Sequence, residues 1–367
     1  MAFSFFKKSK PAGPSGSNYH LLTVKSVIRE TADAVQIVFE QPEKPLVYRS
    51  GQFLTLIFSI EGKEVRRAYS LCSSPLLGEN PAVAVKRVNG GLVSSHVVSN
   101  LKEGDQVQVM DPAGHFTLDL KPEAKKHYIL FSGGSGITPM LSLIKSILYT
   151  EPGSHCTLVY CNRDDQSIIF KDQFEVIRSK YSGQFDLHHV LEQPSANLKS
   201  YVGLLNESIL NEILSAAPSF SQESSVYMMC GPEGLMNKIT ELLTAKGIPA
   251  DAIRHESFTS SAVKVTPLSG SETGTSSAHD VLIRYDGQEF KVHVEPGETI
   301  LATALAQGID LPYSCQSGLC TACRGKALSG KVKLDEEDGL SKSEREEGYI
   351  LTCVGHPLTD DVVIEIG

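Results

Sequence analysis

The sequence of 367 residues lacks any apolar run of the roughly 18 to 20 residues that a membrane-spanning helix needs, so we expect no stable membrane insertion. Residues 1–18 lack the apolar core of about 7 to 15 residues that marks a secretory signal, so we expect a disordered arm and a cytoplasmic location. The net charge is −9, so the sequence lacks the excess of Lys and Arg that a nucleic-acid-binding surface requires. A soluble globular protein without stable membrane insertion and without nucleic-acid binding is therefore expected.

The negative charge is concentrated near the C-terminus. Residues 279–367 contain 16 Asp and Glu but only 8 Lys and Arg, whereas the rest of the chain is almost neutral. A small acidic domain of this kind suits docking to a basic patch on a partner protein. An acidic surface that only keeps the protein in solution explains the charge equally well.

The hydrophobic pattern predicts three folded regions and one tether. Short strand-like runs between turn signals predict an antiparallel β-barrel over residues 19–120. Alternating strand and helix patterns predict an α/β domain with a parallel sheet over residues 121–258. Twelve of the 21 residues from 259 to 279 are Ser, Thr or Gly, which predicts a flexible linker. Residues 280–367 are typical of a small α+β domain.

Two local signals organise this last region. The pair Asp286-Gly287 lies between two strand-like runs and predicts a tight hairpin turn. The run that begins at Thr299 has a helical pattern, and Gly308 predicts where that helix ends.

Four of the eight cysteines crowd into the last 53 residues with a distinctive spacing. Cys315, Cys320 and Cys323 follow the pattern C-x4-C-x2-C, and Cys353 lies far downstream. This is the spacing that ligates plant-type [2Fe–2S] clusters, and Gly318 would let the backbone approach the cluster. A zinc site is a weaker alternative because zinc ligands usually come as two close pairs. Four unrelated cysteines are the remaining interpretation.

A glycine-rich turn over residues 132–139 (SGGSGITP) joins a strand to a helix. Its glycines, Gly133, Gly134 and Gly136, can wrap a pyrophosphate at the helix N-terminus, and Thr138 can cap the helix. The turn departs from G-x-G-x-x-G, so it can also be a structural turn without a ligand.

Cys230-Gly231 ends a second apolar strand, where open α/β sheets bind ligands. Taken alone, however, Cys230 is more often a small buried hydrophobic residue.

The segment Arg67-Ala68-Tyr69-Ser70 lies on a predicted barrel strand. Alternation places Arg67 and Tyr69 on one face and Ser70 on the other. An arginine, an aromatic ring and a hydroxyl suit the phosphate, the ring and a ring nitrogen of a flavin. An ordinary strand with one core aromatic is the alternative.

The order of these motifs resembles the ferredoxin-NADP reductase superfamily, over residues 19–367. It is most similar to members with a flavin barrel, a nicotinamide domain and a C-terminal plant-type ferredoxin domain. The resemblance therefore implies an antiparallel β-barrel for FAD, a parallel-sheet α/β domain for the nicotinamide nucleotide and a β-grasp-like [2Fe–2S] domain.

The resemblance also implies roles for barrel residues. Arg67 would bind the FAD pyrophosphate, beside Ala68, while Tyr69 would stack on the isoalloxazine ring and Ser70 would hydrogen-bond near N5. In a second flavin element, Gly91 and Ser94 would meet the pyrophosphate.

In the nicotinamide domain, the resemblance places the nucleotide against Gly133, Gly134, Gly136, Thr138 and Gly231. Cys230 would lie close to the nicotinamide, and Glu256 near the hydride path, so that Ser70, Cys230 and Glu256 form the catalytic set. Phe258 would cover the flavin, although an ordinary core aromatic is an alternative for it.

The implied activity is electron transfer from NAD(P)H through FAD and the [2Fe–2S] cluster to an oxygenase partner. Because cofactors carry this chemistry, no nucleophile–base triad is needed, and none stands out. Arg163 follows a strand and can pair with a 2′-phosphate, which favours NADPH, but Asp164 and Asp165 weaken that case and NADH stays possible.

Within the superfamily the chain is similar to reductase subunits of the phenylacetyl-CoA epoxidase type. The supporting features are R-A-Y-S-L, Asn162-Arg163, residues 168–170 and the C-terminal residues 348–366. Reductases of steroid and other ring hydroxylases share this layout and are the alternative. A stand-alone NAD(P)H oxidase or acceptor reductase and a non-catalytic docking or redox-sensing module are two further hypotheses.

Overall fold

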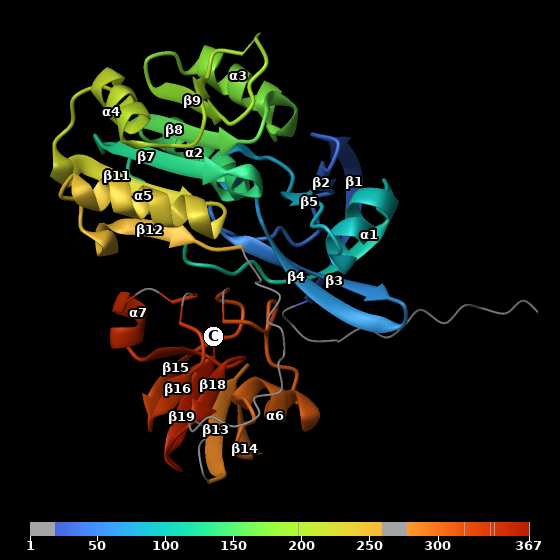
Figure 1. The fold of residues 1–367 in the computed structure, drawn as a ribbon. Coiled ribbons are helices and arrows are strands. Elements are labelled where there is room, and N and C mark those ends of the chain that lie inside the picture. The colour runs from blue at the N-terminus through green and yellow to red at the C-terminus, as the bar shows by residue number, and fades with distance from the viewer. Residues whose placement is uncertain are drawn as a thin grey trace, which may run out of the picture.

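The structure, a computed structural model, describes residues 19–196, 198–258, 277–318, 320–337, 339–340 and 342–366. The predicted arm and residues 259–276 of the predicted linker lie outside these ranges. Figure 1 shows an antiparallel and a parallel sheet side by side, with the C-terminal region beneath them. Within the described ranges, no helix has the length and hydropathy needed to cross a membrane. The predicted boundaries at residues 120, 258 and 279 stay predictions.

The first sheet is antiparallel throughout and has the strand order β4-β3-β6-β1-β2-β5. Its strands are β1 (Tyr19–Arg29), β2 (Ala34–Phe39), β3 (Phe53–Ile60), β4 (Lys63–Ser70), β5 (Ala82–Lys86) and β6 (Gln106–Met110). An antiparallel bridge between Leu71 and Val83 joins the end of β4 to β5, so the two edges of the sheet meet. Apolar side chains on the inner face, Leu54 and Leu56 among them, form the core that the alternating pattern predicts.

The first region also contains a helix, so the all-β interpretation of residues 19–120 is wrong at this point. Helix α1 (Leu92–Asn100) follows β5 and lies beside the barrel (Figure 1). It buries Val93, Val97 and Val98 in the barrel core. Because valine and serine have low helix propensity, tertiary packing and not local preference stabilises this helix.

The second sheet is parallel and has the order β10-β9-β8-β7-β11-β12. Its strands are β7 (His127–Gly133), β8 (His155–Asn162), β9 (Phe185–Leu191), β10 (Tyr201–Val202), β11 (Ser225–Cys230) and β12 (Ile253–Glu256). Helices α2 (Ile137–Thr150) and α3 (Lys171–Lys180) share one core with Tyr128 and Leu130. Helices α4 (Glu207–Ala216) and α5 (Glu233–Ala245) share another with Ile129 and Phe131. Alternate residues of β7 thus face opposite helix layers, as in a doubly wound sheet.

Strand order reverses next to β7. The chain passes from β7 outward through β8 to β9, then returns to place β11 on the other side of β7. Such a switch point opens a crevice at the carboxyl ends of the strands, where ligands bind. The glycine-rich turn follows β7 and Cys230-Gly231 ends β11, so both motifs lie at this crevice.

The C-terminal region contains a five-stranded sheet with the order β14-β13-β19-β15-β17 and a small β16-β18 ladder. Its elements are β13 (His279–Tyr285), β14 (Gln288–Val294), α6 (Ile300–Ala306), β15 (Arg324–Ser329), β16 (Val332–Leu334), α7 (Lys342–Glu346), β17 (Tyr349–Leu351), β18 (Gly355–Pro357) and β19 (Val362–Ile366). β13 and β19 are parallel, and the other pairs are antiparallel. The β-grasp-like α+β expectation is confirmed.

Both local signals of this region are confirmed as well. β13 and β14 pair from Tyr285 and Gln288 outward, so the hairpin turns at Asp286-Gly287. The hydroxyl of Thr299 accepts a hydrogen bond from the Ala302 N–H and caps α6. Gly308 has a left-handed φ of 78° just after this helix.

Buried serines join the barrel to α2 of the parallel sheet. The hydroxyl of Ser146, on α2, lies 2.5 Å from Ser50 Oγ and 2.7 Å from Ser74 Oγ. Beside it, Ser142 Oγ donates to the Ser73 carbonyl at 2.6 Å. Because α2 starts at the glycine-rich turn, these bonds fix that turn relative to the barrel.

The substitution Ser146→Ala is expected to lower the free energy of unfolding by about 1–3 kcal/mol, because it removes a bonding partner from two buried hydroxyls. Chemical denaturation measures this loss. The exposed Ser215→Ala is the control and should change the free energy by less than about 0.5 kcal/mol. Equal stability of the two variants would contradict the role given to Ser146.

Candidate functional site

The predicted flavin segment lies on β4, which pairs with β3 without an irregularity. Arg67 is exposed and its guanidinium donates to the Arg66 carbonyl at 2.7 Å. Tyr69 is half-buried and packs against the barrel core, Ala68 is half-buried, and Ser70 is buried at the end of the strand. The strand therefore places Arg67 and Tyr69 on one face and Ser70 on the other, as the alternation predicts.

The second predicted flavin element lies at the N-terminus of α1. Gly91 precedes the helix, and no side chain caps it. The Ser94 hydroxyl accepts a hydrogen bond from the Val88 N–H at 3.0 Å, which folds the loop back on the helix. Free N–H groups at a helix N-terminus suit a phosphate, so Gly91 and Ser94 lie where such a group can bind.

The glycine-rich turn and Cys230-Gly231 pack directly against each other. A Cβ atom on Gly136 would lie 2.0 Å from the Cys230 carbonyl oxygen, so only glycine permits this approach. Gly133 ends β7, Gly134 lies in the following turn, and Gly231 adjoins the Gly133 backbone. The two motifs, almost 100 residues apart, thus form one surface at the switch point.

Thr138 does not cap α2, so that expectation is wrong. The helix starts one residue earlier, at Ile137, and Gly136 occupies the N-cap position without a side-chain hydrogen bond. The Thr138 hydroxyl instead donates to the Ser135 carbonyl at 2.5 Å. The first amides of α2 are therefore left without a side-chain cap, which suits a phosphate.

Ser70 meets Glu256 across the boundary between barrel and parallel sheet. The Ser70 hydroxyl donates to Glu256 Oε2 at 3.1 Å, and Glu256 pairs with Cys230 in the β11–β12 register. Burial raises the pKa of Glu256 to about 8, against the opposing effect of the Ser70 hydroxyl. Burial, followed by the charge of Glu256, raises the pKa of the Cys230 thiol well above its usual value. The structure thus brings together the three residues of the predicted catalytic set.

The positions of two other predicted residues, Phe258 and Arg163, do not decide the roles predicted for them. Phe258 is 40% exposed and lies at the end of the described segment, so its cover of the flavin stays a prediction. The side chain of Arg163 is 70% exposed just beyond β8, and its Nε donates to Asp164 at 2.9 Å. Arg163 therefore lies at the correct edge of the sheet for a ribose phosphate but has an acidic competitor.

Ser132 begins the glycine-rich motif but is not among the residues that the sequence predicts to bind the nucleotide. It is fully buried in β7 beside Cys230, and its Oγ has no hydrogen-bond partner among the described residues. A buried hydroxyl without a partner is costly unless a ligand satisfies it. With the uncapped start of α2, this observation fits a nucleotide at the switch point. Its position directly before Gly133 was the available signal.

Strand pairing and the loop before β15 bring the four C-terminal cysteines into one part of the domain. Cys323 directly precedes β15 and Cys353 closely follows β17, and these strands pair antiparallel. The Thr352 N–H and hydroxyl both bond the Cys323 carbonyl, at 3.1 and 3.0 Å. Cys315 and Cys320 lie in the preceding loop, in which Gly318 has a left-handed φ of 75°. A Cβ on Gly318 would lie 2.7 Å from the Glu336 Cβ.

The thiols of Cys315, Cys320, Cys323 and Cys353 affect one another. Contacts from the Cys320 and Cys353 thiols lower the pKa of Cys315, while contacts from Cys315 and Cys323 raise that of Cys353. The four thiols therefore lie close enough to influence one another, as ligands of one centre would. No group of three or more His, Cys, Asp or Glu in the described ranges has a geometry suited to a metal ion, so this assignment rests on spacing and thiol contacts.

Two further hydroxyls support an iron–sulfur group at this loop. Ser314 and Ser317 flank Cys315, and the buried Oγ of each lacks a partner within the described part of the chain. The Ser317 N–H already donates to the Cys315 sulfur at 3.4 Å. Hydroxyl and amide donors aimed at sulfur are how proteins tune such clusters, so the residues present fit the group. Their position beside Cys315 in the motif was the signal in the sequence that could have found them.

Three family models match the chain in the predicted order. The Oxidoreductase FAD-binding domain matches residues 20–118, the Oxidoreductase NAD-binding domain matches 130–241, and the 2Fe-2S iron-sulfur cluster binding domain matches 283–358. Together they span the three sheets. These three matches support FAD, a pyridine nucleotide and a [2Fe–2S] cluster as cofactors of the protein.

Relatives match along almost the whole chain. The ferredoxin reductase component of 3-ketosteroid-9-alpha-monooxygenase from Rhodococcus rhodochrous is 38% identical, over 96% of this chain and 98% of its own. One of the subunits of 1,2-phenylacetyl-CoA epoxidase from Escherichia coli K12 is 36% identical, over 95% and 98%. The chain belongs to this family of oxygenase reductase components. This reductase is thus an NAD(P)H-dependent flavin and iron–sulfur oxidoreductase.

The fold of the reductase agrees with a solved structure. Phthalate dioxygenase reductase, described as modular for electron transfer from pyridine nucleotides to [2Fe-2S], aligns with a TM-score of 0.56 and 24% identity. The alignment covers 95% of this chain and 98% of that one. The three-part architecture is therefore shared.

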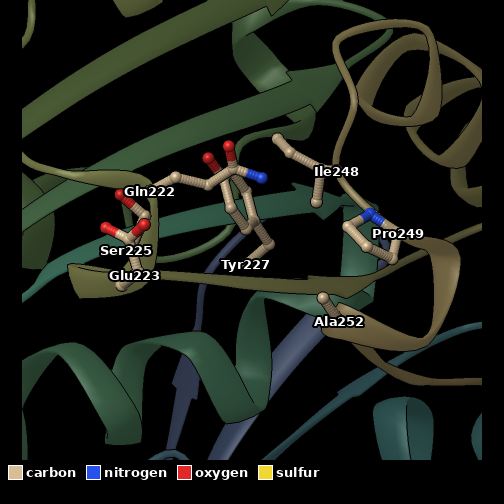
Figure 2. Close-up of a pocket in the computed structure, with 7 residues that line it drawn as sticks. All are labelled: Gln222, Glu223, Ser225, Tyr227, Ile248, Pro249 and Ala252. Carbon is tan, nitrogen blue, oxygen red and sulfur yellow. The ribbon is translucent and has the colours of Figure 1, made fainter.

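One surface hollow of the reductase lies away from these motifs. It measures about 390 Å³ and is lined by residues that include Ser225, Tyr227 and Ile248 (Figure 2). Ser225 begins β11, whereas Cys230 ends it. The hollow therefore lies at the amino ends of the strands, opposite the carboxyl ends where the site lies. It has no part in the site formed by Ser70, Glu256 and Cys230.

The raised pKa of Glu256 predicts a pH dependence of stability. The folded protein keeps a proton on Glu256 that the unfolded chain loses near its ordinary pKa of 4.5, so the stabilisation is full below that pH and declines as the pH rises through about 8. Denaturation between about pH 5 and pH 9 should therefore show a smaller decline for Glu256→Gln than for the wild type. The exposed Glu241→Gln is the control and should keep the wild-type slope. The same slope in Glu256→Gln would exclude a buried proton.

Proposed function

We propose that this reductase takes hydride from a nicotinamide nucleotide at the Ser70–Glu256–Cys230 site and delivers single electrons through its C-terminal loop to an oxygenase. The observation that carries the proposal is the hydrogen bond from Ser70, on the barrel, to Glu256, on the parallel sheet. It joins the strand end assigned to the flavin to the sheet edge assigned to the nucleotide. Neither the barrel motif nor the motif of the parallel sheet requires this contact when taken alone.

The chain's own residues prepare this meeting point. Bound FAD supplies a carrier that accepts two electrons and releases them singly, and the [2Fe–2S] cluster supplies a one-electron carrier. The Ser70 hydroxyl is held at Glu256, whose raised pKa keeps it protonated near neutral pH. Cys230 keeps its thiol neutral and contributes a small, polarisable surface. These residues place an uncharged, water-poor wall where a flat nicotinamide ring can approach a flavin.

The nucleotide is held at the switch point in this proposal. The uncapped start of α2 and the partnerless Ser132 hydroxyl would bind its pyrophosphate and nearby polar groups. Gly133, Gly134, Gly136 and Gly231 leave the backbone accessible to it. Arg163, at the carboxyl edge of β8, would pair with a 2′-phosphate, which makes NADPH the proposed donor.

The proposed acceptor is an oxygenase of the phenylacetyl-CoA epoxidase type. The similarity to the subunit from Escherichia coli supports this choice. The similarity to the component from Rhodococcus rhodochrous supports a steroid monooxygenase as the alternative acceptor. Supplying the reductase to each purified oxygenase and measuring product per NADPH oxidised distinguishes them. Oxidation of NADPH with no product from either would instead favour a stand-alone oxidase. We further infer a cytoplasmic location, supported by eight free cysteines, all in the described ranges.

Cys320→Ser tests the exit of the electron path. We expect the variant to lose the cluster absorbance and the delivery of electrons to the oxygenase, because four thiolates are needed to hold two irons. Hydride reduction of the flavin should survive, as measured by anaerobic bleaching with NADPH. Cys161→Ser, outside the cluster loop, is the control and should keep the cluster spectrum. Full oxygenase turnover with Cys320→Ser would overturn the ligand assignment.

Arg163→Ala tests the donor. Loss of a charge-assisted hydrogen bond should lower kcat/KM for NADPH by about 10- to 100-fold and leave kcat/KM for NADH almost unchanged. Arg178→Ala, which removes a surface arginine paired with Glu175 on α3, is the control. An equal effect on both nucleotides would show that Arg163 does not read the 2′-phosphate.

A further inference from the structure

Arg66 is a buried arginine where the barrel meets the C-terminal region. Its side chain is only 4% exposed although it lies next to the exposed Arg67 on β4. Its guanidinium donates to Glu64 at 2.8 Å and to Asp310 Oδ1 at 3.1 Å. A buried charge of this kind needs partners, and half of its ion pairing comes from a residue 244 positions away.

Aromatic residues from both regions complete the contact. The Tyr19 hydroxyl, at the start of β1, donates to Asp310 Oδ2 at 2.6 Å. The guanidinium carbon of Arg66 lies 4.3 Å from the ring centroid of Tyr313, which adds a cation–π contact. We call the four residues Tyr19, Arg66, Asp310 and Tyr313 the docking clasp.

The clasp holds the segment that leads into the cluster loop. Tyr313 is two residues before Cys315, so the clasp and the first predicted ligand share one short stretch of chain. Between Asp310 and Tyr313, Leu311 is fully buried in the core of the C-terminal region. This stretch is anchored to that core. The contacts of Asp310 and Tyr313 with the barrel therefore position the cysteine loop together with the rest of its domain.

A second approach of the two regions lies beside another predicted ligand. Arg324 directly follows Cys323, and its charge adds to the effect of burial in lowering the pKa of His115, a barrel residue. Together with the contacts of Asp310 and Tyr313, this places residues on both sides of the cysteine loop towards the barrel region.

Strand β4 connects these observations to the electron path. Arg67 and Tyr69 lie on one face of β4 and Arg66 and Ser70 on the other, and the predicted flavin contacts are Arg67, Tyr69 and Ser70. The same strand therefore carries flavin contacts and the anchor for the cluster loop. Electron transfer weakens steeply with distance, so a contact that fixes this separation sets the rate of the internal step.

We propose that the docking clasp holds the cluster loop against the flavin barrel during internal electron transfer, with Arg66 and Asp310 as positioning residues. This inference rests on the proposed function. It adds that the rate of electron passage from flavin to cluster depends on a specific ion pair between two domains, and not only on the presence of both cofactors.

Asp310→Ala tests the clasp in the full, cofactor-loaded protein. Arg66 keeps its ion pair with Glu64 in this variant and gains solvent where the contact opens, so each domain should stay folded. In anaerobic stopped-flow experiments with NADPH, flavin reduction should keep its wild-type rate. Cluster reduction should slow by about tenfold or more, because a charge-assisted hydrogen bond and its ion pair are lost. Arg66→Lys, which keeps the charge but loses the planar fork, should give an intermediate rate.

Hydrogen–deuterium exchange gives a readout that does not depend on turnover. Peptides that contain Tyr19 and residues 309–314 should exchange faster in Asp310→Ala than in the wild type, because the contact that protects both is lost. Asp360→Ala is the matched control: it removes an acidic partner of His279 in the same region, away from the clasp. It should change neither the exchange nor either rate.

The results separate this inference from the function on which it rests. Wild-type cluster reduction and exchange in Asp310→Ala would overturn the clasp while leaving the proposed function intact. Slower cluster reduction without faster exchange would also overturn it, since domain docking would then be unchanged. Absence of the cluster-reduction phase in the wild type would instead overturn the proposed function itself.

Discussion

The hydrogen bond between Ser70 and Glu256 is the contact on which the rest of the site depends. Ser70 can reach Glu256 only if the barrel is held against the parallel sheet, which the buried serines before β3 and after β4 accomplish by bonding α2. Glu256 can lie beside Cys230 only because β12 pairs in parallel with β11. The raised pKa of the carboxyl follows from this burial. Positioning and electrostatics in this site are therefore consequences of one domain junction.

The close approach of Gly136 to the Cys230 carbonyl is the second constraint. It brings the start of α2 against the end of β11, so that a helix N-terminus, a neutral thiol and the partnerless Ser132 share one edge. A larger side chain at position 136 would push these groups apart. The geometry proposed for nucleotide binding and hydride transfer thus depends on the absence of a single Cβ atom.

Features encoded locally could be predicted from the sequence. The cysteine spacing, the hairpin at Asp286-Gly287 and the end of α6 near Gly308 each depend on neighbouring residues, and the structure agrees with the last two. Helix α1 could not be predicted, because its valines favour strands and only burial against the barrel makes them helical. The positions of Ser132, Ser314 and Ser317 in or beside the motifs were visible in the sequence, but their lack of hydrogen-bond partners was not, since burial is not a local property.

The pairing of Arg66 with Asp310 shows the same limit at the scale of domains. Arg66 and Arg67 are the same residue type in adjacent positions, and alternation predicts only that they face opposite ways. Asp310 and Tyr313, nearly 250 residues downstream, bury Arg66 in a contact between domains, so that Arg67 is the arginine left exposed for the predicted phosphate contact. Because β4 carries both arginines, a one-residue shift in its pairing register would exchange the faces on which they lie. The predicted flavin contact of Arg67 and the domain contact of Arg66 are therefore coupled through the register of one strand.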